Sequence, residues 1–213
     1  SLYKLFGVNA ELLIDHAWGR EPCTITDIKN YKSATKSLSS SQVLMRDYKT
    51  NEAIIVAKEM MDQLCLDMAA QHYLTESVSL YIGYSLSEGI RGSGGTAMLS
   101  TGTNLSSIIL PAVDVLYRRI VRPGFAIRQI GLSCNSVYQD NGAYQLNMFE
   151  DTEKQIRGKA LQEALLSIRS RYGKNSILKG INYDPAATGR ERNQQIGGHK
   201  SGTENSKSPH VQK

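Results

Sequence analysis

Hydrophobic and polar residues alternate between Ser77 and Ser85 with the period of two that is typical of a β-strand. Val78, Leu80, Ile82 and Tyr84 share one face of this stretch, and Ser79, Tyr81 and Gly83 share the other. Three further strands are predicted, at Ser37–Met45, Thr96–Thr103 and Ala126–Val137. The glycine-rich stretch Gly89–Gly95 is expected to form a turn between two of these strands.

Two stretches with helical spacing separate the strands. We expect Asn51 to cap a helix that runs to about His72. A second helix is predicted to begin at Asn104 or Ser106, and Pro111 either lies in its first turn or kinks it. The apolar stripes are Ala53, Ala57, Met60, Leu64 and Met68 in the first helix, and Ile108, Ile109, Ala112, Val113, Leu116 and Ile120 in the second.

The element order from Ser37 to Tyr138 is therefore β-α-β-β-α-β, which predicts an α+β fold with a four-stranded sheet and two helices on one face. The other face would present hydroxyl, amide and glycine residues. Two interpretations of that face stay open. It is an ordinary solvated face of an antiparallel sheet, or it is a surface that contacts the phosphate backbone of a nucleic acid.

The flanks of this domain, residues 36–140, follow different patterns. On the amino-terminal side, residues 1–19 read as a short helical piece broken at Gly7, and residues 20–35 read as a linker with Pro22 and no sustained period.

On the carboxyl-terminal side, residues 151–181 are predicted to form a helical region, whose helix Asp151–Tyr172 is ended by Gly173. Its expected apolar stripe consists of Ile156, Leu161, Ala164, Leu165, Ile168 and Tyr172. Residues 182–213 are polar and glycine-rich, so we expect a mobile tail.

Composition limits the possible binding partners and the cellular compartment of the chain. The net charge of +5 permits binding to a polyanion. No run of apolar residues is long enough to cross a membrane, and the first residues do not resemble a signal peptide. Three widely spaced cysteines favour a reducing cytoplasm over a disulfide framework or a zinc cluster. The lack of an initiator methionine suggests a piece of a longer protein.

The chain lacks the common catalytic signatures. There is no phosphate-binding P-loop, no HExxH and no paired CxxC motif. The four histidines are scattered, and no pair of acidic residues suggests a two-metal site. The glycines at 92–95 lie in a predicted hairpin rather than at a helix start, which argues against a phosphate loop. We therefore expect no complete active site in this chain.

Four stretches, in order, resemble the C-terminal part of Y-family DNA polymerases, and more closely the UmuC-like (ImpB/MucB/SamB) translesion branch of Gram-positive bacteria, their plasmids and phages. They are KSLSSSQVLMRDY (Lys36–Tyr48), IGYS (Ile82–Ser85) with the hairpin and GTN that follow, IRQIGLS (Ile127–Ser133) and QLNMFED (Gln145–Asp151). IRSRYGKNSIL and ATGRERNQQIGGHKSG also resemble the tail of this branch, so the likeness covers nearly the whole chain.

The resemblance implies a little finger domain, which holds primer-template DNA through contacts to its backbone. Residues 1–19 then resemble the end of the thumb domain. The palm carboxylates that bind Mg²⁺ have no counterpart here, so the resemblance implies that this chain needs no cofactor and does not polymerise by itself. The parent protein is expected to be an error-prone, Mg²⁺-dependent polymerase of the cytoplasm, associated with the nucleoid and with tolerance of DNA damage.

The expected DNA-binding residues combine the polar face of the sheet with this resemblance. They are Lys36, Ser37, Ser39, Ser40, Ser41, Ser79, Tyr81, Thr96, Thr101, Thr103, Arg128, Gln129 and Ser133. Gln129 and Ser133 stand where relatives often have basic residues, which predicts a weaker grip on DNA.

Residues 141–150 are predicted to bind the bacterial sliding clamp, because Gln145, Leu146, Asn147, Met148 and Phe149 resemble the QL-x-LF clamp-binding motif. Met148 replaces the usual leucine, so we expect weaker docking, in the micromolar range, or about −8 kcal/mol. The alternative is that Leu146 and Phe149 attach the last helix to the sheet. The alternative for the whole chain is a protein-interaction module with incidental basic charge.

Overall fold

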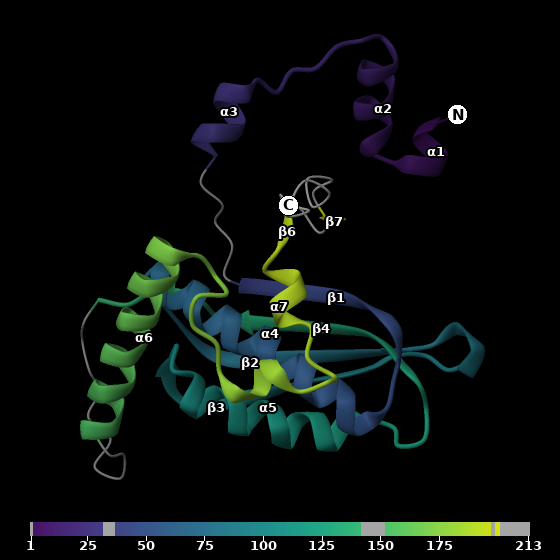
Figure 1. Cartoon of the computed structure of the whole chain (residues 1–213). Helices are drawn as coiled ribbons and strands as arrows, with labels where there is room; N and C mark the ends of the chain where they lie inside the picture. The colour runs from purple at the N-terminus through teal and green to yellow at the C-terminus, as the bar shows by residue number, and fades with distance from the viewer. Residues whose placement is uncertain (1, 32–36, 142–151, 197–198, 201–213) are drawn as a thin grey trace, which may run out of the picture. The chain divides into compact units, whose positions relative to one another are not determined.

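The fold is described by a computed structural model that covers residues 2–31, 37–141, 152–196 and 199–200 (Figure 1). The chain divides into two units, Ser1–Thr35 and Lys36–Lys213. The second unit contains the predicted sheet.

The sheet consists of β1 (Ser37–Tyr48), β2 (Tyr73–Tyr84), β3 (Ser93–Thr103) and β4 (Ile127–Asn135). All pairings are antiparallel, in the order β1-β4-β2-β3. Helices α4 (Thr50–Ala70) and α5 (Ser106–Ile120) lie on one face (Figure 1). The short strand β5 (Tyr138–Gln139) pairs with the start of β2. The predicted β-α-β-β-α-β order and the α+β fold class are confirmed.

The core lies between the sheet and the two helices. Val78, Leu80 and Ile82 of β2 are at most 2% exposed, as the alternation predicts. Every member of the apolar stripe predicted for α4 is buried against them. Each large side chain buried in this way stabilises the fold by about 1.5–3 kcal/mol before the entropy of ordering is counted. This core on the helix side therefore keeps the strands, and with them the opposite open face, in a fixed arrangement.

The helix starts differ from the predictions. The N-cap of α4 is Lys49, and Asn51 lies inside the helix. The N-cap of α5 is Leu105, so neither predicted residue has that role. Pro111 lies in the second turn of α5, where its ring removes one backbone hydrogen bond. At α4 the carboxylate of Glu52 accepts the N–H of Lys49 (2.8 Å), and before α5 the hydroxyl of Thr103 accepts the N–H of Leu105 (3.1 Å). Residue type alone does not indicate either contact.

Two boundaries in the hairpin between β2 and β3 also differ. Gly94 and Gly95, expected in the turn, belong to β3, and a short 3-10 helix, η1 (Leu86–Glu88), occupies the turn. Gly89, with φ +64°, ends that helix in the left-handed conformation that glycine adopts most easily.

Helix α6 (Thr152–Tyr172) packs on α4 with a face that coincides with the predicted one only at Leu165 and Ile168. Gln162 and Leu165 are buried, whereas Ile156 and Leu161 are each 60% exposed and Tyr172 is 69% exposed. The polar side chains decide this orientation. Gln162 donates a hydrogen bond to the backbone carbonyl of Asn104 (2.8 Å). No helix among the described residues is long and apolar enough to span a membrane.

Residues 179–194, here called the C-terminal segment, are packed rather than free, which corrects the expectation of a mobile tail from residue 182. The segment contains η2 (Gly180–Tyr183) and α7 (Gly189–Arg192), and Ala186 is 3% exposed. Beyond it, β6 (Gln195–Ile196) pairs with β7 (His199–Lys200). Residues 201–213 of the predicted tail lie outside the described residues.

The first unit contains α1 (Leu2–Phe6), α2 (Asn9–Ala17) and α3 (Ile25–Asn30). Gly7 separates the first two helices, as predicted, whereas α3 lies in the stretch expected to be a linker. Its N-cap Thr24 and Asp27 form a capping box that the sequence analysis missed.

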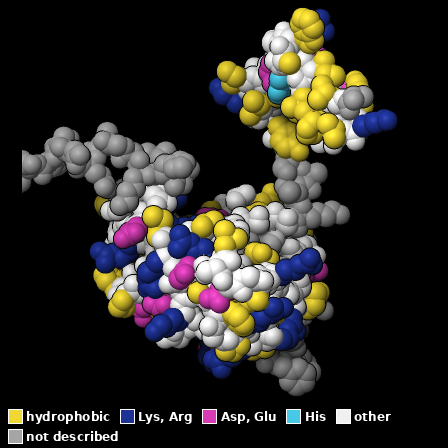
Figure 2. Space-filling view, turned by 90° about the vertical axis from the view of Figure 1, so that its right-hand side faces the viewer, with side chains coloured by type: hydrophobic (Ala, Val, Ile, Leu, Met, Phe, Trp, Pro, Cys, Tyr) yellow, Lys and Arg dark blue, Asp and Glu magenta, His cyan; other side chains and the backbone are white. Residues whose placement is uncertain are grey.

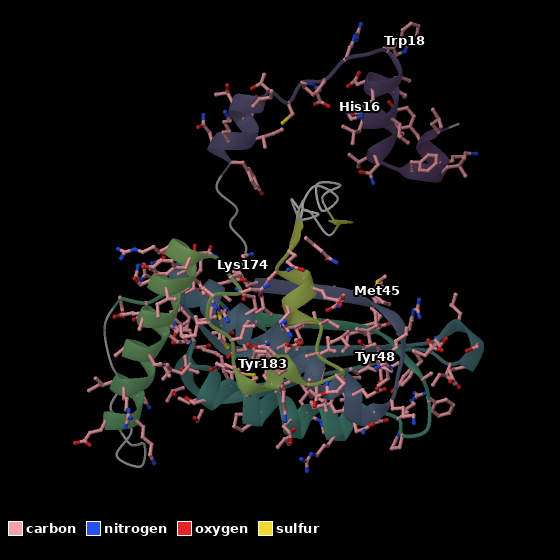
Figure 3. The ribbon with its side chains drawn as sticks, in the orientation of Figure 1. His16, Trp18, Met45, Tyr48, Lys174 and Tyr183 are labelled. Atoms are coloured by element: carbon pink, nitrogen blue, oxygen red, sulfur yellow. The ribbon has the colours of Figure 1, made fainter. Side chains whose placement is uncertain are left out.

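Among the described residues of this first unit, Ala10 alone is buried. Trp18 is 78% exposed (Figure 3), and hydrophobic side chains gather on the surface of the unit (Figure 2). The described residues of this unit therefore form no core of their own.

All three cysteines are free. Cys23 is exposed, and Cys65 and Cys134 are buried in the second unit. The sulfur of Cys134 lies 3.8 Å from that of Met61. Burial raises the pKa of Cys134 to about 12 and the pKa of Cys65 well above its usual value.

Candidate nucleic-acid interface

The face of the sheet opposite the helices presents hydroxyl side chains in line across the strands. The register places Ser39 of β1 beside Ser133 of β4, Ser133 beside Ser79 of β2, and Ser79 beside Thr96 of β3. These four residues, here called the hydroxyl row, were all predicted as site residues. Neighbouring strands lie about 4.8 Å apart, so the row extends over roughly 14 Å.

Hydrogen bonds hold the hydroxyl row in place. The hydroxyls of Ser79 and Thr96 lie 2.8 Å apart, and the side-chain amide of Asn135 donates to Ser79 (2.8 Å). Ser133 donates to the side-chain carbonyl of Asn135 (2.8 Å). Asn135 was not among the predicted site residues, although its shared face with Ser133 could have indicated it. Three of the four side chains in the row, those of Ser79, Thr96 and Ser133, are therefore held in place by hydrogen bonds.

A second line across the sheet places Tyr81 among glycines. Tyr81 pairs with Gly131 on one side and with Gly94 on the other. A Cβ atom at Gly131 would lie 3.5 Å from the Cβ of Tyr81, and one at Gly92 would lie 2.3 Å from its hydroxyl oxygen. The ring of Tyr81, which is 44% exposed, thus lies against the backbone with part of its surface open to solvent.

Three of the residues predicted to bind DNA do not lie on the open face of the sheet. Ser40 faces the helix side, where the guanidinium of Arg192 donates to its hydroxyl (3.5 Å). Thr103 is buried, and its hydroxyl accepts the N–H of Leu105 (3.1 Å). Thr101 lies where the pairing of β2 with β3 is irregular and is partly buried. Both threonines have the opposite parity to Thr96 along β3, so the alternation of the strand itself places them on the helix side.

Arg128 and Gln129 lie at an irregularity in β4. The pairing of β4 with both neighbours shifts here, so Ile127 and Ile130 are both buried although they are three residues apart. Arg128 forms an ion pair with Asp47 (3.6 Å), and Gln129 donates to the hydroxyl of Ser41 (3.4 Å). The positive charge of Arg128 is thus partly compensated.

The open face is uncharged along its described rows. Ser37 and Ser41 extend the hydroxyl surface on β1, and both are exposed. Met45 on β1 (Figure 3) and Met98 on β3 are 84% and 72% exposed. The face therefore offers neutral hydrogen-bond donors and acceptors beside apolar side chains, rather than a basic patch. Figure 2 shows the side of the molecule that lies to the right in Figure 1, and Lys and Arg side chains are dispersed over it.

Six of the predicted site residues have no described position. Lys36 and the clamp-binding residues Gln145, Leu146, Asn147, Met148 and Phe149 lie outside the described residues, so both interpretations of the QLNMF stretch stay predictions. Within the described ranges, no group of three His, Cys, Asp or Glu side chains could hold a metal ion.

Comparison with known proteins identifies a family that this chain matches. Residues 35–148 match the impB/mucB/samB family C-terminal domain. The chain is 29% identical over 202 residues to the "Putative UV-damage repair protein UvrX" of Bacillus subtilis (strain 168), covering 94% of this chain and 47% of that protein. It is 24% identical to DNA polymerase IV 2 of Halalkalibacterium halodurans, over 91% of this chain and 46% of that protein.

Solved structures are more distant. The chain matches a structure described as a complex of beta-clamp processivity factor and little finger domain of PolIV, with a TM-score of 0.38 and 10% identity, over 54% of this chain and 99% of that one. A post-insertion binary complex of Dbh DNA polymerase matches with a TM-score of 0.37 and 11% identity, over 65% of this chain and 38% of that one.

The chain spans about half the length of the relatives it matches. The match to residues 35–148 covers the whole sheet with both of its helices and more than half of the chain. This chain belongs to the impB/mucB/samB family, and residues 35–148 are its C-terminal domain.

Proposed function

We propose that the open face of the sheet binds the backbone of duplex DNA, within a longer DNA polymerase that tolerates damaged templates. The observation that carries the proposal is the hydroxyl row, which crosses all four strands and in which Ser79, Thr96 and Ser133 are held by hydrogen bonds to one another and to Asn135. Serine, threonine, tyrosine and asparagine side chains commonly donate hydrogen bonds to phosphate oxygens and carry no sequence information in doing so.

The neutral chemistry of this face has a consequence for affinity. Salt dependence of DNA binding reflects the number of phosphates neutralised by Lys and Arg, and this face has few such residues. Binding should therefore be weak, independent of sequence and only moderately sensitive to salt. Those properties suit a polymerase that must act at any position and then leave.

The catalytic step belongs to the remainder of the parent protein in this proposal. Names of relatives, among them DNA polymerase IV 2, support a polymerase as the parent. Mg²⁺ would be bound by carboxylates of that remainder, since the described residues here offer no such site. The present chain would position the primer-template and would not itself add nucleotides.

The DNA contact is tested by placing carboxylates on the hydroxyl row. We expect Ser39→Glu with Thr96→Glu to weaken binding of a short duplex by about tenfold or more, because each carboxylate repels a phosphate. The readout is fluorescence anisotropy of a labelled duplex at low salt. The matched control, Ser107→Glu with Val115→Glu, adds the same charge to exposed positions of α5. Equal weakening in both variants would reject the proposed face.

The sliding clamp is the second proposed partner, on the strength of the QLNMF resemblance alone. We expect the whole chain to bind a bacterial clamp with micromolar affinity, and Leu146→Ala with Phe149→Ala to abolish that binding because the apolar anchors are lost. Surface plasmon resonance measures it, and the duplex affinity of the variant serves as the control. A variant that unfolds would instead support the alternative in which these side chains attach α6 to the sheet.

One observation favours the alternative function, a module that binds another protein. Ile156 and Leu161 lie exposed on α6. If this alternative holds, Leu161→Glu removes binding to a protein partner, and Ser39→Glu with Thr96→Glu changes neither DNA binding nor partner binding.

A further inference from the structure

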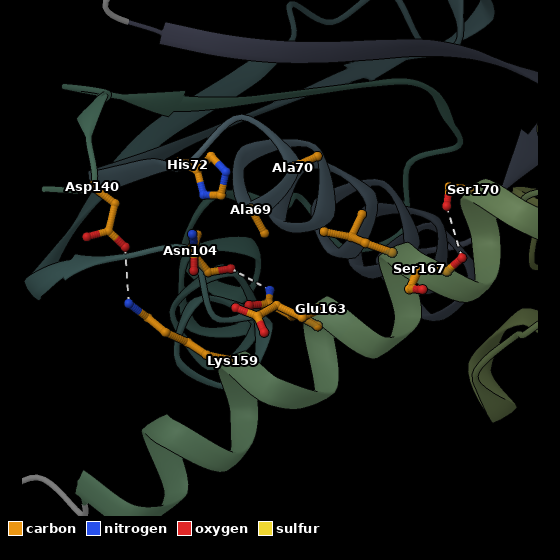
Figure 4. A pocket seen from close by; sticks show the side chains of 11 residues that line it. Ala69, Ala70, His72, Asn104, Asp140, Lys159, Glu163, Ser167 and Ser170 are labelled. Carbon is orange, nitrogen blue, oxygen red and sulfur yellow. Dashed lines mark hydrogen bonds and ion pairs between the residues drawn. The ribbon is translucent and has the colours of Figure 1, made fainter. Parts of the chain in front are cut away.

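A cavity of about 540 Å³ lies away from the open face, between the carboxyl-terminal end of α4 and helix α6 (Figure 4). Asn104, which joins β3 to α5, forms part of its wall, together with His72 and Asp140. The N–H of Asp140 donates to the carbonyl of His72 (2.7 Å), so backbone hydrogen bonding fixes this side of the wall. The proposed DNA contact does not use any of these residues.

Asn104 contributes a buried acceptor without a donor. Its side chain is nearly inaccessible, with the residue 5% exposed. The side-chain amide donates to the carbonyl of Tyr73 (3.0 Å), which fixes the orientation of the group. Its Oδ1 then accepts no hydrogen bond from any described residue. A buried acceptor left unpaired is costly, so the site is complete when a ligand supplies an N–H or O–H donor.

The charges around the cavity favour a cation. Lys159 and Asp140 compensate each other as an ion pair (3.1 Å). Glu163 of α6 also lines the cavity, and it has no ion pair among the described residues. The carboxyl-terminal end of α4, a helix of 21 residues, adds partial negative charge beside it. The cavity thus combines an uncompensated carboxylate, a helix end of negative sign and a buried carbonyl oxygen.

We propose that this cavity binds a cationic N–H donor on an apolar stem, that is, a primary ammonium or guanidinium group. The cation would lie between Glu163 and Asn104 Oδ1, and its stem would contact Leu166 and Ala69, which also line the cavity. Such a group belongs either to a lysine or arginine side chain of a protein or to a free amine. An anionic ligand would face Glu163 and the helix end and is disfavoured.

The test uses the whole chain and three probes: N-acetyl-lysine methylamide, 1,5-diaminopentane and N-acetyl-norleucine methylamide. Nuclear magnetic resonance follows the side-chain amide signals of Asn104 and the backbone amides around the cavity. We expect both cationic probes to shift these signals saturably and the uncharged norleucine probe to leave them unchanged. Tighter binding of the capped lysine would indicate a protein side chain as the natural ligand, and tighter binding of the diamine a free amine.

A charge variant separates the site from general electrostatics. Glu163→Gln should weaken binding of the preferred probe about fivefold, the size expected for loss of one exposed ion pair. The matched control is Glu153→Gln, an equal change on the same helix about 15 Å away. Equal weakening by both variants, shifts by the norleucine probe as large as those by the cations, or no saturable shift by either cation would each overturn the proposal.

Discussion

At the junction of β1 and α4, one carboxylate fixes the point where the strand ends. Glu52 accepts hydrogen bonds from the guanidinium of Arg46 (2.7 and 3.1 Å) and from the N–H of Lys49 (2.8 Å). The guanidinium in turn lies over the ring of Tyr48, 4.0 Å from its centroid. These hydrogen bonds, that of Arg46 first, lower the pKa of Glu52 from 4.5 to about 2.

The contribution of Glu52 to stability depends on pH because of this lowered pKa. A lowered pKa in the folded state means that ionised Glu52 stabilises the fold fully above about pH 4.5, and that this contribution is lost as the pH falls toward 2. Glu52→Gln should therefore lower the free energy of unfolding by about 1 kcal/mol near neutral pH, and by less at each lower pH. Urea denaturation at a series of pH values measures this difference.

The control for that series is Glu163→Gln, an exposed residue in the middle of α6, which should leave the unfolding free energy unchanged at every pH. A loss of stability in Glu52→Gln that is the same at all pH values would contradict the role given to the charge.

The same junction shows why helix caps were predicted poorly. Asn51 is of the type that favours the N-cap position, yet the contacts of Glu52 with Lys49 and Arg46 move the start of α4 back. Likewise, Ser40 and Thr103 have the right chemistry for the open face but lie on the opposite side of the sheet. Residue type alone gives chemistry, whereas position depends on hydrogen bonds and register shifts between residues distant in sequence.

At the scale of elements, the C-terminal segment is held mainly by polar contacts. The buried carboxylate of Glu59 on α4 accepts the N–H groups of Thr188 (2.8 Å) and Gly189 (3.0 Å), and it also bonds the side chain of Asn182. Lys179 forms an ion pair with Asp62. Because few apolar side chains are buried here, Glu59 decides whether the segment stays in place.

Gly189 provides the prediction at this scale. A Cβ atom at this position would lie 2.8 Å from Oε1 of Glu59 and 3.3 Å from the amide nitrogen of Asn182. Gly189→Ala should loosen the C-terminal segment, so that hydrogen exchange of its amides accelerates about tenfold, which corresponds to about 1.4 kcal/mol. Gly180→Ala, in the same segment with no atom within 4 Å of the added group, is the matched control.

Exchange in the sheet should be unchanged in both variants. A Gly189→Ala protein with normal protection of the C-terminal segment would show that Glu59 and Asn182 move aside at little cost.

Elements stabilised by apolar periodicity were predictable, and elements stabilised by polar contacts were not. The stripe of α4 and the alternation of β2 identify the core directly. On α6, the buried Gln162 joins Leu165 of the predicted stripe on the inward face, whereas Ile156 and Leu161 stay exposed. The C-terminal segment has too few apolar residues to be recognised, because its partner is the carboxylate of Glu59.

At the scale of the whole molecule, the two units differ in how they treat apolar side chains. The sheet unit buries them in one core, whereas the described part of the first unit exposes them. The family and the fold could be predicted from the order of the four motifs, and residues 35–148 match that family. The neutral character of the open face was also foreseen at Gln129 and Ser133, while the ion pair of Arg128 with Asp47 required the structure.

The reactivity of the three thiols can be used to follow unfolding, because one is exposed and two are buried. Thiolates are the species that react with alkylating agents, so the raised pKa values of Cys65 and Cys134 and their burial suppress reaction in the folded state. Iodoacetamide should modify Cys23 quickly and the other two only when the sheet unit opens. Mass spectrometry would distinguish the early adduct at Cys23 from the later adducts at Cys65 and Cys134. The delay measures the opening equilibrium, and Cys23 offers a single attachment point for a dye on the native protein.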